Sequence, residues 1–339
     1  MKTLSKEQLA GQRLMVGFDG PDFNDDVKYL IDCLQVGGII LFAQNVKSPE
    51  QIKELCTAMQ SHATATGNPP LFIAIDQEGG QVARLKAPFT QFPGNPHMTM
   101  EEDAIHFAEV TATELSQAGI NMNLAPVMDV APRNINSIMA ARAFGHDPAW
   151  VTRLGIKVIN HLQQNQIMAV AKHFPGIGRT VLDSHLELPN LDAELADLQS
   201  FDLIPFEASI ASNVSGILLS HILYQNIDPQ WPASLSPRIA RDLLRDQMGF
   251  AGVTLTDDLD MGAIAKHFDI QTIIGQALEA EIDIVMICHK GPNIELAFEE
   301  MVKLFTDSPE LNKKAIASAR RIMKLKKQYL GFKGSEVQA

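Results

Sequence analysis

The chain has 339 residues, a length that suits two ordinary domains or a single α/β barrel. Hydrophobic residues make up 46% of it, so a large core can form and extensive disorder is excluded. The formal net charge of −12 argues against a nucleic-acid partner, because binding to phosphates needs a basic surface. The three cysteines are widely spaced and form neither a disulfide framework nor a paired metal motif, which favours a reducing compartment.

Two kinds of segment that target or anchor proteins have no counterpart in this sequence. The first ten residues contain no apolar stretch of signal-peptide length, and no run approaches the roughly 18 apolar residues of a membrane span. We therefore expect a cytoplasmic protein with no membrane partner. The basic segment Lys313–Lys327 is expected to form a helix that packs on the rest of the protein, with its lysines in solvent.

Eight short apolar runs recur along the chain. They are rich in Ile, Val and Leu and mostly do not alternate with polar residues, which is typical of parallel strands buried on both faces. In chain order the predicted strands are Leu14–Val16, Gly38–Phe42, Leu71–Ile75, Ile120–Leu124, Met168–Ala171, Gly216–Leu219, Gly252–Leu255 and Ile282–Ile287.

Segments of helical period lie between these runs. Several begin with a capping residue followed by proline, as at Ser48-Pro49, and one ends at a glycine, Gly249. The predicted helices are Ser48–His62, Glu101–Ala118, Pro148–Gln164, Ser236–Met248, Thr272–Ala280 and Leu311–Leu330. This alternation predicts one α/β domain over residues 1–339, a (β/α)8 barrel possibly with a distorted strand, and a C-terminal helix at 311–330. A doubly wound open sheet is the alternative.

Functional side chains of a (β/α)8 barrel follow its strands, at the C-terminal face. Polar and ionisable residues do follow six of the predicted strands: Asp76 to Gly80, Asp129, Lys172-His173, Ser220-His221, Asp257-Asp258 and His289-Lys290. Helix capping explains some of the Ser and Asp residues, but not Lys172-His173. Gly79-Gly80 predicts a tight turn near the site. No HxH, HExxH or paired-Cys spacing indicates a metal, and we expect no cofactor.

Four motifs in order along the chain carry a family resemblance. Residues 172–176 read Lys-His-Phe-Pro-Gly, and the following loop reaches Asp183-Ser184-His185. With residues 74–80 upstream and 256–259 downstream, the sequence resembles glycoside hydrolase family 3 from about Gly17 to Phe332. The Asp-Ser-His element is similar to that of the single-barrel β-N-acetylhexosaminidase branch, which trims N-acetylglucosamine from cell-wall fragments. Other members use a glutamate from a second domain, which we expect to begin only where this chain ends.

The resemblance implies a retaining exo-β-N-acetylglucosaminidase that forms a covalent glycosyl-aspartate and needs no cofactor. Asp257 would be the nucleophile, and its neighbour Asp258 would point the other way if the strand continues that far. His185 would be the acid/base, because an imidazole titrates near neutrality and can both give and take a proton. Asp183 would hold one nitrogen of that ring, and the loop from Ile177 to Leu188 would move to bring His185 to the sugar.

The family pattern also suggests which residues bind the sugar. They are Asp76, Arg84, Arg142, Lys172 and His173, since a carboxylate can accept from two hydroxyls and an arginine can donate in a fork. Each also has a structural interpretation, as a salt-bridge partner or a strand-end residue. The expected partner is a small saccharide, an N-acetylglucosaminide of muropeptide type, and the expected assembly is a monomer or homodimer.

The sequence departs from the family pattern after residue 176. Ile177 stands where His is common, and Arg179 stands where Asp is frequent. Arg179 is open to two interpretations, a contact with an anionic aglycone or a solvated side chain. Four other functions stay open: a phosphorylase, a β-glucosidase or β-xylosidase, an enzyme that forms a Schiff base at Lys172, and a catalytically silent glycan binder.

Overall fold

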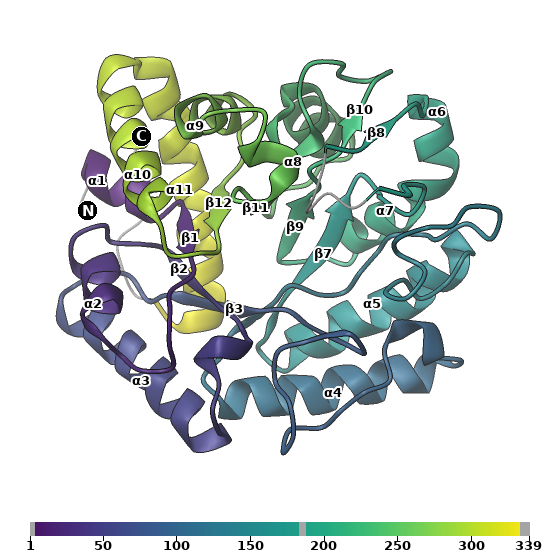
Figure 1. Cartoon of the computed structure of the whole chain (residues 1–339), viewed down its shortest axis with the longest axis horizontal. Coiled ribbons are helices and arrows are strands. Elements are labelled where there is room, and N and C mark those ends of the chain that lie inside the picture. The colour runs from purple at the N-terminus through teal and green to yellow at the C-terminus, as the bar shows by residue number, and fades with distance from the viewer. Residues whose placement is uncertain (1–3, 183–187, 333–339) are drawn as a thin grey trace.

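The computed structural model describes residues 4–182 and 188–332. In these residues eight parallel strands close into a barrel, with helices around it (Figure 1). Each strand pairs with its neighbours in chain order, and the last pairs with the first. The strands are β1 (Leu14–Val16), β2 (Gly38–Leu41), β3 (Phe72–Ile75), β6 (Met122–Asn123), β7 (Met168–Phe174), β9 (Gly216–Leu219), β11 (Val253–Asp258) and β12 (Ile284–Ile287). The predicted (β/α)8 barrel is confirmed, and the open sheet is excluded.

The helices follow the local signals in the sequence. Ser48 Oγ accepts from Gln51 N at 3.2 Å, with Pro49 in the first turn, and Asp147 caps the helix that starts at Pro148. The helices are α1 (Lys6–Gly11), α2 (Asp25–Asp32), α3 (Pro49–Ala65), α4 (Glu101–Gln117), α5 (Pro148–Gln164), α6 (Leu195–Asp197), α7 (Ile204–Ala211), α8 (Gly262–Ala265), α9 (Ile270–Glu279), α10 (Pro292–Asp307) and α11 (Pro309–Leu330). No helix in the described ranges is long and apolar enough to cross a membrane.

The structure differs from the predicted helices in two ways. It contains α2, α7 and α10, which the periodicity did not single out, and the predicted helix at Ser236–Met248 is a π-helix over Arg238–Gln247. Two short sheets lie outside the barrel, β4 (Gln77–Gly79) with β5 (Val82–Ala83), and β8 (Asn190–Leu191) with β10 (Leu223–Tyr224). The first contains the predicted glycine turn, with φ of +85° at Gly79 and +62° at Gly80.

The apolar core has two layers. The larger one lies between the barrel and its helices, and the smaller one fills the barrel with side chains such as Met15, Phe72 and Met168. Ile322 and Met323 of α11 belong to this inner layer as well. The C-terminal helix therefore packs against the interior of the barrel as well as its outside.

Lys326 corrects the expectation that the lysines of α11 all face solvent. Its side chain is fully buried, and Nζ donates to Gln12 Oε1 at 2.7 Å and to the carbonyl of Gly37 at 2.9 Å. The ammonium also lies over the Phe72 ring, 4.9 Å from its centroid. Burial lowers the pKa of Lys326 well below its usual value, because its hydrogen-bond partners carry no charge that would offset desolvation.

A buried carboxylate joins α11 to the strands beneath it. Asp283, which is fully buried, pairs with Arg245 Nη2 at 2.6 Å and Arg321 Nη2 at 2.8 Å. It also accepts from Thr254 N at 3.0 Å. Burial would raise the pKa of Asp283, but the charges of the two arginines outweigh this effect and lower the pKa to about 2.

Replacement of this carboxylate should destabilise the fold. The change Asp283→Ala leaves Arg245 and Arg321 without their partner, and we expect a loss of about 3–5 kcal/mol in the free energy of unfolding. Urea denaturation followed by circular dichroism measures it. The control Asp246→Asn, at an exposed position on the π-helix, should change stability by less than about 0.5 kcal/mol.

The pKa of Asp283 also predicts how stability depends on pH. Because the folded-state pKa is below the unfolded one, the contribution of Asp283 is fully present above the unfolded value of 3.8 and is lost as pH falls toward about 2. The difference in stability between wild type and Asp283→Ala should therefore shrink over that interval. An equal difference at pH 7 and pH 3 would contradict the assigned ion pairs.

Candidate active site

A cavity of about 330 Å³ opens at the C-terminal ends of the barrel strands. Five of the eight sequence-predicted site residues line it: Asp76, Arg84, Lys172, His173 and Asp257. The other lining residues are Ile40, Phe42, Leu124, Leu218, Asp258, Met261, Met286, Cys288 and His289. The structure therefore brings together side chains that follow β3 and β5 and side chains at the ends of β7 and β11.

Charges of alternating sign form a buried network on one side of the cavity. Lys172 Nζ lies 2.6 Å from Asp76 Oδ1 and 2.7 Å from Glu78 Oε1. Arg142 donates to both oxygens of Glu78, from Nε at 3.0 Å and from Nη2 at 2.7 Å. Arg84 Nη2 donates to Asp76 Oδ2 at 3.3 Å. Each carboxylate thus lies between two cations.

The network holds Asp76, Glu78 and Lys172 in their charged forms. Burial would raise the pKa of Asp76, but the charges of Lys172 and Arg84 outweigh it and lower the pKa to about 2. The pKa of Glu78 is lowered in the same way by Lys172 and Arg142. Burial would lower the pKa of Lys172, but the two carboxylates raise it. The lysine is therefore an ammonium ion, which disfavours a Schiff base because that reaction needs a free amine.

Glu78 is a member that the sequence analysis did not assign to the site. It stands in β4, two residues beyond Asp76, and only 2% of its side chain is exposed. It links Arg142 to Lys172, and Arg142 itself is not among the cavity-lining residues. The sequence does contain a sign of this role, since Glu78 closely follows the third predicted strand. Periodicity, however, cannot show which of the nearby acids forms ion pairs with a lysine or arginine elsewhere in the chain.

Asp257 and Asp258 end β11 beside the cavity. Asp258 N donates to Asp257 Oδ1 at 2.9 Å, whereas Asp258 Oδ1 accepts from Cys288 N at 2.9 Å and Asp260 N at 3.1 Å. Asp258 is thus engaged with backbone N–H groups. Burial raises its pKa, an effect that those hydrogen bonds only partly offset. Both acids line the cavity, so the predicted division of roles between them stays a prediction.

His221 forms a hydrogen bond with the backbone of the Asp257-Asp258 pair. Its Nε2 lies 2.9 Å from the carbonyl oxygen of Asp258 and its Nδ1 lies 2.6 Å from Ser234 Oγ. Burial lowers the pKa of His221, although the charge of Asp257 opposes this. A neutral ring that donates from Nε2 and accepts at Nδ1 satisfies both contacts.

The remaining predicted catalytic residues, Asp183 and His185, lie outside the described residues. The segment that precedes them is described, and Ile177 there is buried in the apolar core. Gly178 packs against the backbone at Val130, where a Cβ would lie 1.7 Å from the carbonyl oxygen. A side chain at position 178 is therefore excluded.

Arg179 is not a simply solvated side chain, whereas its contact with an anionic aglycone stays a prediction. Its Nε lies 2.8 Å from Oδ2 of the buried Asp202, although the N–H is not aligned for a hydrogen bond. The guanidinium also lies over the Phe201 ring, 5.1 Å from its centroid. Burial raises the pKa of Asp202 to about 7, despite the charge of Arg179. Arg179 therefore anchors the start of the 177–188 loop to the segment around Phe201.

One group beside the cavity could hold a metal ion. Ligand atoms of Asp258, Asp260 and His289 all lie within 4.8 Å of one another. However, the His289 side chain is 68% exposed, and Asp260 Oδ1 already accepts from Asn293 at 2.7 Å. No further observation points to an ion here, and the expected lack of a metal stays a prediction.

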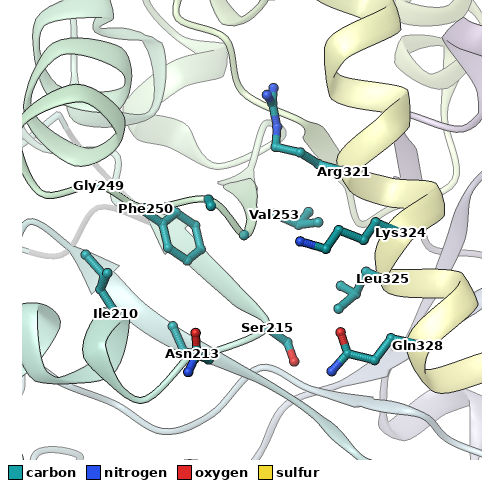
Figure 2. A pocket seen from close by; sticks show the side chains of 13 residues that line it. Ile210, Asn213, Ser215, Gly249, Phe250, Val253, Arg321, Lys324, Leu325 and Gln328 are labelled. Carbon is teal, nitrogen blue, oxygen red and sulfur yellow. The ribbon is translucent and has the colours of Figure 1, made fainter. Parts of the chain in front are cut away.

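A second hollow, of about 200 Å³, lies at the opposite end of the barrel. Figure 2 shows Arg321, Lys324 and Gln328 of α11 on one side of it and Phe250 and Val253 on the other. It contains none of the predicted site residues. Residues at this end of a (β/α)8 barrel usually serve stability, and here Arg321 is the partner of Asp283.

Glu78→Gln tests the charge network without a change in side-chain shape. The amide removes the charge that Lys172 and Arg142 share, and we expect a loss of about 3 kcal/mol in the free energy of unfolding, measured in urea. The control Glu279→Gln removes an exposed carboxylate 2.6 Å from Lys314 and should cost at most about 1 kcal/mol. Equal effects of the two changes would count against a buried network.

Comparison with known proteins gives the family. Residues 6–325 match the model of the glycosyl hydrolase family 3 N terminal domain. A beta-hexosaminidase of Pseudomonas aeruginosa is 32% identical over 302 residues, which cover 87% of this chain and 88% of that protein. A beta-hexosaminidase of Nitrosomonas eutropha is 35% identical over 287 residues, which cover 81% and 80%.

Solved structures agree with this match. A glycoside hydrolase family 3 β-N-acetylglucosaminidase from Paenibacillus sp. superposes with a TM-score of 0.93 at 34% identity, over 99% of this chain but only 65% of that one. A β-N-acetylhexosaminidase from Beutenbergia cavernae superposes with a TM-score of 0.87 at 29% identity, over 95% of this chain and 98% of that one. The chain therefore belongs to glycosyl hydrolase family 3.

Proposed function

We propose that the protein is a retaining exo-β-N-acetylglucosaminidase. The observation that carries the proposal is the presence of Asp257 in one cavity with Asp76, Arg84, Lys172 and His173. A nucleophilic carboxylate and a set of charged hydroxyl-binding groups are what cleavage of a terminal sugar with retention requires. The names of the relatives, beta-hexosaminidase and β-N-acetylglucosaminidase, support the choice of sugar.

In the first step Asp257 attacks the anomeric carbon while an acid protonates the leaving oxygen. We assign the acid to His185, steadied by Asp183, because of the Asp-Ser-His motif. Water then attacks the glycosyl-aspartate as His185 takes its proton, and the sugar leaves with its configuration retained.

The charge network around Asp76 would hold the sugar. Asp76 stays ionised at all working pH values because its pKa is about 2, so it can accept from two hydroxyls. Lys172 and Arg84 already contact this carboxylate and are fixed in position before the sugar binds. Groups that are held in place lose less conformational entropy on binding. The cavity is near the lower end of the usual range for small-molecule sites, about 300–1,000 Å³, which favours a single sugar ring.

The source of the saccharide and the cellular location are part of the proposal. The resemblance to the single-barrel branch favours cell-wall-derived N-acetylglucosaminides, with a muropeptide-like aglycone, and a cytoplasmic enzyme. The anionic composition fits a small uncharged ring better than a polyanion.

Asp257→Ala should reduce hydrolysis of an aryl β-N-acetylglucosaminide by several orders of magnitude, because no covalent intermediate can form. The control is Asp260→Asn, since that carboxylate follows the same strand and bonds to Asn293 rather than lining the cavity. Release of the aryl group measures both. Near-normal turnover by Asp257→Ala would remove the nucleophile assignment.

A fluorinated N-acetylglucosaminide with a good leaving group gives a direct test. The wild type should carry a glycosyl adduct on the peptide that contains Asp257, detected by mass spectrometry.

Product analysis with inorganic phosphate decides the acceptor, since a sugar 1-phosphate would identify a phosphorylase. A panel of aryl glucosides and xylosides decides the sugar.

A further inference from the structure

Asp129 is a fully buried carboxylate at the C-terminal end of the barrel, in the segment that follows β6. Its side chain accepts from three N–H groups of one turn. Oδ2 lies 2.7 Å from His173 Nδ1 and 3.3 Å from His173 N, and Oδ1 lies 2.8 Å from Ile177 N. No other carboxylate is within hydrogen-bond distance of His173 among the described residues.

The two contacts of the His173 ring determine which nitrogen carries the proton. A carboxylate only accepts, so Nδ1 must donate to Asp129. On the other side, Arg142 Nη2 lies 3.3 Å from His173 Nε2, and a guanidinium only donates. Nε2 must therefore be the bare nitrogen. Both neighbours favour the same tautomer, with a lone pair on Nε2 and the hydrogen on Nδ1.

We propose that Asp129 is a positioning residue that fixes the tautomer of His173 and the turn from 173 to 177, so that the single lone pair of Nε2 accepts from Arg142 and the ring holds that guanidinium against the charge network beside the cavity. The expected effect on turnover rests on the proposed function. The anchoring of the ring and the turn does not.

The contact to Ile177 makes Asp129 more than a partner of the ring. One oxygen fixes the imidazole and the other fixes the backbone four residues later, so ring and turn are held relative to each other. The turn also approaches Val130 so closely that position 178 needs glycine. Asparagine cannot replace the carboxylate here, since its NH2 group would face one of the N–H donors.

The wild-type enzyme can be tested first by 15N nuclear magnetic resonance of labelled histidines. The two ring-nitrogen shifts of His173, assigned by their loss in His173→Gln, should show a protonated Nδ1 and a bare Nε2 at neutral pH. A ring protonated on Nε2, alone or together with Nδ1, would overturn the proposal. This measurement needs neither activity nor a stable variant of Asp129.

The variant Asp129→Asn then tests whether Asp129 determines the tautomer of His173. The His173 ring should lose its preference for the Nδ1–H tautomer, and kcat/KM for the aryl β-N-acetylglucosaminide should fall about 10- to 100-fold, the usual effect of losing a charged hydrogen-bond partner. The control Asp202→Asn changes another buried acid against the same turn, which does not contact His173. It should leave the tautomer unchanged.

A double-mutant cycle separates positioning from general destabilisation. In the His173→Gln background, Asp129→Asn should lower kcat/KM by much less than in the wild type, because the ring it positions is gone. Fully additive losses, or an unchanged tautomer in Asp129→Asn, would overturn the assignment. If the wild type does not hydrolyse the glycoside, the proposed function fails, whereas the resonance measurements still decide the role of Asp129.

Discussion

The ion pairs of Lys172 with Asp76 and Glu78 are the interaction on which the site depends. They join the ends of β3, β4 and β7, so the relative position of three segments is set by charge as well as by the barrel backbone. An ammonium ion that is 3% exposed is tolerated only because two carboxylates offset the loss of its hydration. The same balance keeps both carboxylates ionised, the state in which their oxygens only accept hydrogen bonds.

A second kind of support surrounds this network. His221 bonds to the carbonyl of Asp258, and Asp129 bonds to the ring of His173. His221 and Asp129 are both buried behind the cavity. Each orients a neighbouring group but does not line the cavity itself. The geometry of the cavity wall therefore depends on residues one layer behind it, where hydrogen bonds are shielded from water.

The fold was largely predictable because each barrel strand is buried on both faces. Such strands appear in the sequence as short apolar runs, and Leu14–Val16 and Gly216–Leu219 coincide with β1 and β9. Lys326 was not predictable in its role. A lysine in a basic, amphipathic helix normally faces solvent. Only the packing of α11 shows that Lys326 is buried and donates to Gln12 and to the carbonyl of Gly37.

The sequence indicates which positions form the site, but it does not indicate which of these side chains pair with each other. Asp76 follows β3, and Lys172 and Asp257 lie near the ends of β7 and β11, so the barrel alone places them on one rim. Which acid pairs with which base depends on distances across the barrel that no local pattern encodes. Arg179 illustrates this, since its partner Asp202 lies beyond the next short sheet strand, β8, and the sequence around Arg179 contains no sign of it.

The packing of α11 into the interior of the barrel has a consequence for the geometry of access. Ile322 and Met323 share one apolar cluster with side chains that fill the barrel, such as Phe72 and Met168, so the barrel interior beneath the cavity is packed and is not a channel. Under the proposed function, a polysaccharide could not pass through the packed barrel, so the terminal sugar would have to enter and leave at the face where the strands end.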